Sequence, residues 1–137
     1  MAARTKARKA ALDILFEADQ RGVNAAELLG QRQATPAGEA PVRDLTATLV
    51  RGTVENWATI NDLITTWSQG WTLDRMPAVD RAILRLGTFE VVYAEGTPEA
   101  VAISEWVGLA TELSTDESPK FVNGLLGRIA EIKPTLV

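Results

Sequence analysis

The sequence of 137 residues contains no histidine and no cysteine. A chain without these side chains lacks the ligands of most zinc and copper sites, and it has no imidazole base and no thiolate nucleophile. It also has no G-x-S-x-G element, no Walker loop and no dinucleotide-binding glycine pattern. These absences predict a protein that is not an enzyme and that uses no metal and no cofactor.

Long apolar runs are missing as well. No stretch approaches the roughly 18 apolar residues that a membrane-spanning helix requires. Asp13 and Glu17 interrupt the segment that would have to be apolar in a secretory leader. The absence of cysteine is compatible with the cytosol. We therefore expect a cytoplasmic protein that makes no contact with a membrane.

Two carboxylate pairs are the remaining candidates for acid–base chemistry: Asp74 with Asp80, and Asp116 with Glu117. Neither pair comes with a nucleophile, a metal ligand or a signature spacing. We interpret all four as solvated acids in loops, so that no catalytic residue is predicted.

The charge of the chain is unevenly distributed. Fourteen basic and 18 acidic residues give a net charge of −4, and a pI of about 4.9 by itself argues against a nucleic-acid partner. However, four of the basic residues lie within the first nine positions, which leaves ten basic and 18 acidic groups to the other 128 residues, a balance of −8. The chain thus has a basic N-terminal arm and an acidic body.

Apolar periodicity predicts one all-α domain, with about six or seven helices. The expected helices cover 4–21, 24–33, 42–68 (one helix or two, bent near Asn56), 77–93, 97–113 and 118–132. The segments 34–41 and 70–76 are expected to be loops, because they contain proline or glycine and no periodicity. The FEVVY segment at 89–93 has strand character, but it lies inside a helical pattern, so no sheet is predicted.

Local signals refine this expectation. The helix at 77–93 is apolar over much of its circumference, which predicts a central position in a bundle. Thr97 is expected to cap the next helix, with Pro98 in its first turn. Gly124 and Gly127 each weaken the last helix by about 1 kcal/mol relative to alanine, which suggests that another backbone approaches them closely.

The basic and aromatic residues leave alternatives open. Arg4 and Arg8 are spaced i and i+4, so a helix places them on one face, suited to successive phosphates or simply to solvent. Trp71, in a glycine-containing connector, suits packing against a loop as well as stacking on a base. Phe121 follows Lys120 at the N-terminus of a helix, a position that favours phosphate. A buried position in the core is an equally good interpretation of Phe121. Helical spacing places Trp57, Trp67 and Trp106 in the core.

Four segments of the chain resemble the NusB family of transcription antitermination proteins. These are RTKARKAALDILF at 4–16, VDRAILRLGTFEV at 79–91, TPEAVAISEWVGLATEL at 97–113 and SPKFVNGLLGRIA at 118–130. The run KFVNG is the most specific part of the resemblance. The segments 22–42 and 70–77 match weakly.

The resemblance implies a fold and a function. The fold is a helical bundle of two stacked subdomains, about 1–70 and 71–137. The function is recognition of boxA RNA of ribosomal RNA operons together with NusE, a small-subunit ribosomal protein. This binding takes place within a transcription elongation complex that contains other Nus factors. Members of the family include both monomers and homodimers.

The resemblance also assigns residues to these roles. The RNA-binding positions are Arg4, Lys6, Arg8, Lys9, Lys120, Phe121 and Asn123. Phe16 and Asp80 correspond to positions that face NusE. The acidic body suits such a partner, because ribosomal proteins are basic.

Two other functions remain open at this stage. The chain suits a helical homodimer that acts purely as an interaction module. The second alternative is an RNA-binding domain related to an enzyme, since NusB-like domains form the N-terminal part of certain ribosomal-RNA cytosine methyltransferases. No segment of this sequence supplies the methyl-donor fold of such an enzyme.

Overall fold

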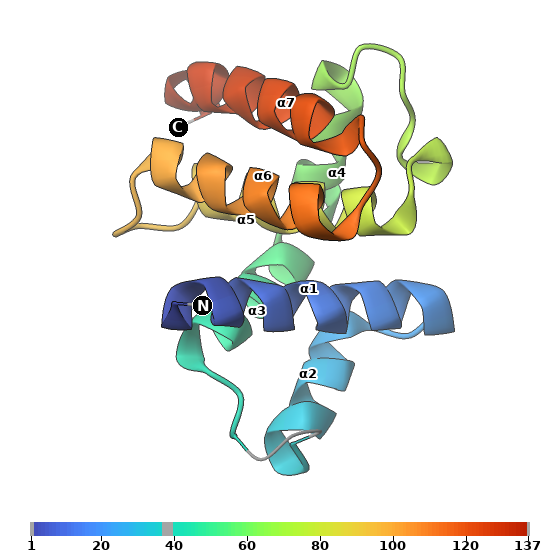
Figure 1. The fold of residues 1–137 in the computed structure, drawn as a ribbon, viewed down its shortest axis with the longest axis vertical. Helices are drawn as coiled ribbons and strands as arrows, with labels where there is room; N and C mark the ends of the chain where they lie inside the picture. The colour runs from blue at the N-terminus through green and yellow to red at the C-terminus, as the bar shows by residue number, and fades with distance from the viewer. Residues whose placement is uncertain (1, 37–39, 137) are drawn as a thin grey trace.

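A computed structural model describes residues 2–36 and 40–136, with side chains placed up to residue 134. Seven α-helices follow one another in the described chain, together with two short 3₁₀ segments, and no strand occurs among these residues (Figure 1). The elements are α1 (Ala3–Arg21), α2 (Ala25–Ala34), α3 (Asp44–Glu55), α4 (Trp57–Trp67), η1 (Leu73–Arg75), α5 (Ala78–Val92), α6 (Glu99–Leu113), α7 (Ser118–Ile132) and η2 (Lys133–Leu136). The predicted all-α fold is confirmed.

The helices form two stacked layers. Figure 1 shows α1, α2 and α3 in the lower layer and α5, α6 and α7 in the upper one. Helix α5 contacts α1 and α3 below it as well as α4, α6 and α7. The prediction that this helix is central is therefore confirmed. No described helix is both long and apolar enough to cross a membrane.

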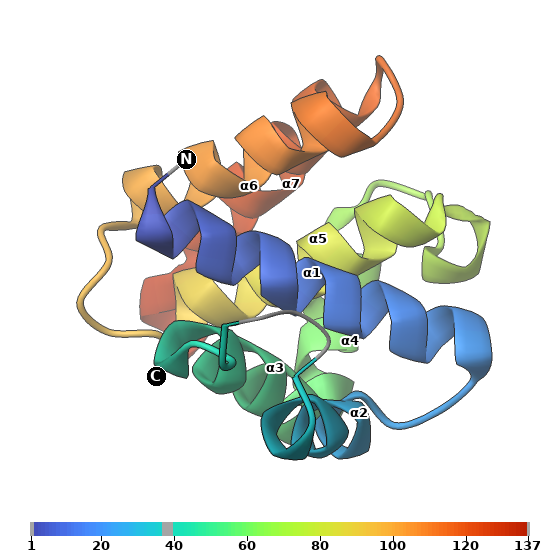
Figure 2. The same ribbon diagram turned by 60° about the horizontal axis from the view of Figure 1, so that its bottom comes forward.

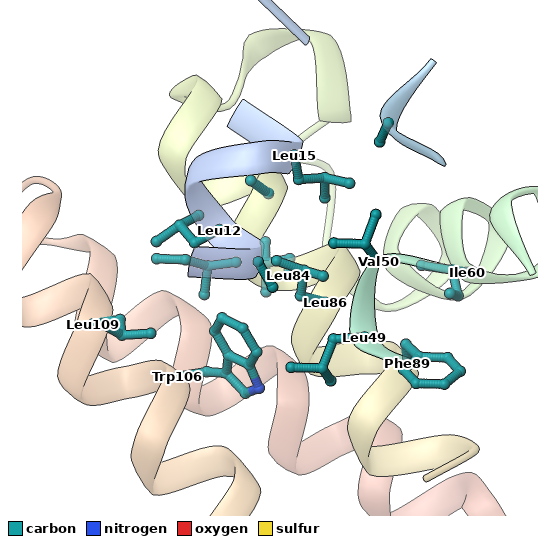
Figure 3. Close-up of a cluster of buried hydrophobic side chains, with 14 of the residues drawn as sticks. Leu12, Leu15, Leu49, Val50, Ile60, Leu84, Leu86, Phe89, Trp106 and Leu109 are labelled. Carbon is teal, nitrogen blue, oxygen red and sulfur yellow. The ribbon is translucent and has the colours of Figure 1, made fainter. Parts of the chain in front are cut away.

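One hydrophobic cluster joins the layers (Figure 3). Leu12 and Leu15 of α1 belong to the same cluster as Leu84 of α5 and Leu109 of α6. Trp106 is fully buried, as its helical spacing predicts. A continuous core of this kind makes the packing of α1 depend directly on α5 and α6.

The FEVVY segment is helical because packing outweighs its local preference for a strand. Residues 89–92 complete α5, and Phe89 and Val91 are both buried. β-Propensity expresses how well a side chain fits a half-buried surface, and a central helix buries such side chains equally well. Tertiary contacts therefore decide the conformation here.

Close packing around glycine occurs at other positions than those expected. A Cβ atom on Gly52 of α3 would overlap the Phe89 ring, and one on Gly87 of α5 would lie 2.9 Å from Cδ1 of Leu126. The expectation for Gly124 and Gly127 is wrong, because neither position meets another backbone. The glycines that allow close approach thus lie on α3 and α5 rather than on α7.

Several helix ends follow the sequence signals, and the start of α6 does not. Gly22, in the left-handed region at φ 67°, ends α1, and Asn24 caps α2 by accepting from the backbone N–H of Ala26 and Glu27. The chain bends at Asn56, as predicted, so that α3 and α4 are separate. The expected cap at Thr97 is wrong: Pro98 precedes α6, and the helix has no side-chain cap.

The remaining loop and domain predictions concern the connections. Part of the loop expected at 34–41 lies outside the described residues, which omit 37–39. The connector at 70–76 contains η1. Helix α4 packs against α5 and α7. The division into 1–70 and 71–137 stays a prediction.

Candidate nucleic-acid interface

The basic arm forms the first turns of α1. Arg4 and Lys6 are exposed, and Lys9 is partly exposed in an ion pair with Asp13, with its Nζ 2.8 Å from Oδ1. Arg4 donates from Nη2 to Oγ1 of Thr97, which holds the arm against the start of the α6 segment. An exposed pair such as Lys9 with Asp13 contributes little stability, so a phosphate can replace the carboxylate. We call Arg4, Lys6 and Lys9 the arm surface.

Arg8 occupies a different environment from the one expected. Its side chain is only 1% exposed, because the face of α1 that carries it turns toward α5 and α6. The spacing does place Arg4 and Arg8 on one side of α1, but that side is covered at Arg8. The prediction that Arg8 reaches a phosphate is therefore corrected: its guanidinium is not accessible to RNA in this structure.

The guanidinium of Arg8 is held by carboxylates. Nε donates to Oε1 of Glu90 at 2.9 Å and Nη2 donates to Oε2 at 2.6 Å, while Nη1 donates to Oε1 of Glu105 at 3.0 Å. The indole Nε1–H of Trp106 also donates to Glu90, and the Thr5 hydroxyl donates to Glu105. The hydrogen bond to Glu90 keeps the pKa of Arg8 above its ordinary value, although burial opposes this. We call these five residues the Arg8 cluster.

The second candidate surface is a groove beside the start of α7. It is lined by Ser68, Gln69, Trp71, Glu117, Lys120, Phe121, Asn123, Gly124 and Arg128, and its volume is about 660 Å³. The predicted residues Lys120 and Asn123 are exposed here, and Phe121 is half-buried with its inner side against the core. The structure thus brings three predicted RNA-binding residues together in one groove, which we call the α7 groove.

Trp71 forms the wall of the α7 groove opposite α7. Its ring meets the Phe121 ring edge to face, with the centroids 4.7 Å apart and the planes at 74°. Gln69 and Gly70, which precede Trp71, both have positive φ, 58° and 94°. Trp71 thus packs on a ring of α7 rather than on a loop, and it remains 37% exposed, so base stacking stays a prediction.

Arg128 is a groove residue that the sequence interpretation missed. It donates from Nε to the carbonyl oxygen of Trp67 at 3.0 Å, which fixes the side chain beside the end of α4. Lys120, Gly124 and Arg128 are spaced i, i+4 and i+8, so they follow one face of α7. This i, i+4, i+8 spacing is the sequence signal by which Arg128 could have been placed beside Lys120. Gly124 leaves the floor of the groove without a side chain, and Nη1 of Arg128 lies 3.4 Å from where its Cβ would be.

The two surfaces lie at opposite ends of α6. Arg4 contacts Thr97 just before α6 begins, whereas Lys120 follows the turn by which the chain leaves α6 for α7. Figure 2 shows the N-terminus near the start of α6 and the α6–α7 turn at its far end. Because α6 has 15 residues, it separates them by about 22 Å. The arm surface and the α7 groove are therefore separate surfaces.

Asp80 is not exposed, which corrects two expectations for it. Its side chain is fully buried, and its carboxylate accepts hydrogen bonds from Ser114 Oγ at 2.6 Å and Ser118 Oγ at 2.8 Å. It is therefore neither a solvated loop acid nor available to a partner. Instead it connects the start of α5 to both ends of the α6–α7 turn.

The remaining predicted partner and core residues are distributed as follows. Phe16 is half-buried on α1, which leaves part of its ring accessible. Trp67 is partly buried, whereas Trp57 is 38% exposed and lies under the Arg85 guanidinium, 4.2 Å from the ring centroid. The core prediction is wrong for Trp57, because α4 begins there at the edge of the bundle.

Within the described ranges, no three acidic residues gather into a cluster suited to a metal ion.

Comparisons with known proteins agree with one another. The model of the NusB family matches residues 5–131. A Nocardioides protein named transcription antitermination protein NusB is 57% identical over 136 residues, which cover 99% of each chain. The structure of T. maritima NusB matches with a TM-score of 0.83 and 32% identity, over 95% of this chain and 92% of that one. A chain from the crystal structure of the antitermination factors NusB and NusE in complex with dsRNA matches with a TM-score of 0.79 and 26% identity, over 93% and 96%.

Proposed function

The chain belongs to the NusB family, and on that premise we propose that it is an RNA-binding transcription antitermination factor. It recognises boxA RNA of ribosomal RNA operons together with NusE and acts in the elongation complex with other Nus factors. The observation that carries this proposal is the pair of cationic surfaces on an otherwise acidic member of this family. The protein is not an enzyme, and its place of action is the cytoplasm.

RNA contact is assigned to the arm surface and to Lys120, Phe121 and Asn123 of the α7 groove. Arg4 and Lys6 are exposed and provide charge for phosphates, which is the sequence-independent part of RNA binding. The groove adds an aromatic ring and an amide, which suit unpaired bases. The solved complex of the relatives NusB and NusE with dsRNA supports RNA binding as the function of this chain. Arg8 positions the arm and does not contact RNA.

Binding of NusE is assigned to the acidic body, with Phe16 at the contact. Opposite charges steer two proteins together, and a basic ribosomal protein complements the balance of −8 outside the arm. A half-buried aromatic ring is typical of the residues that contribute most to such interfaces. Asp80 is excluded from this contact by its burial.

The arm surface predicts a measurable salt dependence. Replacing Arg4 and Lys6 together by alanine should weaken boxA RNA binding and lower the slope of log K against log salt by about 1.4, since each lost phosphate contact to a single strand removes about 0.7. The control variant replaces Arg21 and Arg51, which are exposed basic residues of the lower layer, and therefore has the same net charge. Binding measured across a salt series distinguishes the two. Equal slopes in both variants would exclude the arm surface.

Phe16 provides the corresponding test for the protein partner. Its replacement by alanine should weaken binding of purified NusE by at least about 5-fold, because truncating an aromatic contact residue removes 1 kcal/mol or more. Val101, which is 48% exposed on α6, is the control position for the same truncation to alanine. Calorimetric titration with NusE gives both affinities. An unchanged affinity for the Phe16 variant would place the NusE contact elsewhere.

A further inference from the structure

We propose that Trp71 stacks on one unpaired nucleobase of the bound RNA, and that Lys120 and Arg128 hold the phosphates on either side of this nucleotide. This inference rests on the proposed RNA-binding function and specifies how the α7 groove takes part in it. Trp71 and Arg128 lie outside the KFVNG run. Trp71 adds a second aromatic ring to the groove, and Arg128 adds a second cation beside Lys120.

The ring contact determines which aromatic face is available. Phe121 is packed against the core, and Trp71 meets it at 74° with 37% of its own surface exposed. In an edge-to-face pair the edge of one ring lies on one face of the other, so the contact with Phe121 covers at most one face of the Trp71 ring. Trp71 therefore offers a ring face to a base, beside the partly exposed Phe121 ring that supports it.

The backbone holds this ring in place before any ligand arrives. Gln69 adopts φ 58°, a left-handed conformation that is uncommon outside glycine, and Gly70 follows at 94°. Such conformations persist where the surrounding structure enforces them, and they concentrate at binding sites. A ring that is already ordered loses little entropy when a base stacks on it.

The charges beside the ring favour a nucleotide as the occupant. Lys120 is exposed on one side of Gly124, and Arg128 lies one turn further along α7. The hydrogen bond to Trp67 uses only Nε of Arg128, and the hydrogen bonds of the described residues do not engage its two terminal nitrogens. Glu117 is the only acidic side chain among the residues that line the groove. An aromatic face flanked by two cations is the combination that single-stranded nucleic acids require.

The size of the groove is consistent with this occupant. A volume of about 660 Å³ lies within the range of about 300–1,000 Å³ that is typical of small-ligand sites. A base within a duplex cannot stack on a protein ring unless it leaves its neighbours, so the groove selects an unpaired nucleotide. Asn123, exposed at the same wall as Phe121, supplies an amide for the edge of that base.

The decisive experiment combines a Trp71 variant with abasic RNA. Trp71→Ala should weaken binding of single-stranded boxA RNA by about 5- to 150-fold, since stacking contributes about 1–3 kcal/mol per base. Trp57→Ala is the matched control, because Trp57 is exposed to 38% but lies at the start of α4 under Arg85. A series of RNAs with a single abasic position is then titrated against the wild-type protein and both variants.

At one position in the series, removal of the base should weaken RNA binding to the wild-type protein and to Trp57→Ala. The loss of affinity should equal the loss that the Trp71→Ala substitution causes with intact RNA. The same abasic RNA should bind Trp71→Ala no more weakly than intact RNA does, because the stacking partner is already absent. Trp71→Phe should restore most of the affinity. Thermal unfolding of all variants verifies that the fold is intact.

The remaining outcomes overturn one proposal or the other. If intact RNA binds wild-type protein and Trp71→Ala equally well, the stacking role is wrong while the proposed function stands. The same holds if a duplex of the same sequence binds with the same dependence on Trp71. If wild-type protein binds boxA RNA no better than a scrambled RNA, with or without NusE, the proposed function itself is wrong.

Discussion

Replacing Glu90 by leucine should lower the free energy of unfolding by about 3–5 kcal/mol, because it leaves the buried Arg8 guanidinium without its main counter-charge. Glu90 is 1% exposed and accepts three hydrogen bonds, two from Arg8 and one from Trp106. Glu105 remains near Arg8, but it is 30% exposed and receives only one of its donors. Denaturant unfolding monitored by circular dichroism measures the effect.

The matched control is Glu131→Leu, an exposed glutamate on α7 whose replacement should change stability by no more than about 0.5 kcal/mol. The double variant Arg8→Met with Glu90→Leu should be more stable than Glu90→Leu alone, because an apolar pair removes the uncompensated charge. If Glu90→Leu unfolds at the same denaturant concentration as the wild type, the Arg8 cluster does not contribute to stability. The double variant should also keep the salt slope of RNA binding, since the Arg8 guanidinium is buried and only 1% of its side chain is exposed.

The second large effect is expected at Gly52, where α3 lies against the Phe89 ring. Gly52→Val should destabilise the protein by about 2–3 kcal/mol, because the added carbons overlap a ring that is only 7% exposed and has little room to move. The control is Gly108→Val on α6. No atom outside the adjoining stretch of α6 lies within 4 Å of the Cβ position there, and valine has a higher helix propensity than glycine.

A double-mutant cycle distinguishes this clash from a general effect of valine in α3. Phe89→Ala alone should destabilise the protein by about 3–5 kcal/mol through the cavity that it leaves. The double variant Gly52→Val with Phe89→Ala should lose clearly less stability than the sum of the two single losses, because the valine side chain fills part of that cavity. Strictly additive effects would mean that the two residues do not contact each other in solution.

The sequence predicted the helices well because their signals are local. Apolar periodicity located the six segments that form the seven described α-helices, and it left open whether 42–68 is one helix or two. Glycine and asparagine signals gave the ends at Gly22 and Asn24 correctly. Thr97 is not the cap because α6 begins at Glu99, with Pro98 before it, and the Thr97 hydroxyl instead accepts from Arg4, a residue 93 positions away. A long-range contact of this kind leaves no trace in a local pattern.

The candidate site was predicted less completely, for the same reason. Charge spacing identified the arm, but burial of Arg8 depends on Glu90 and Glu105, which come from two later helices. Asp80 likewise differs from expectation because two serines near the α6–α7 turn enclose it. Trp71 was recognised only as an alternative, since its contact with Phe121 joins segments 50 positions apart.

Helix α6 has a consequence for how an RNA bound at both of its ends would dissociate. Because the 15 residues of α6 separate the two surfaces, such an RNA would be a bivalent ligand, with one contact on the arm surface and the other in the α7 groove. Once one end is bound, the other rebinds at an effective concentration in the millimolar range, provided that the intervening nucleotides match the span. An RNA bound at both surfaces would then have a long residence time although each contact is weak, and the length of α6 would set the RNA spacing that gives this effect.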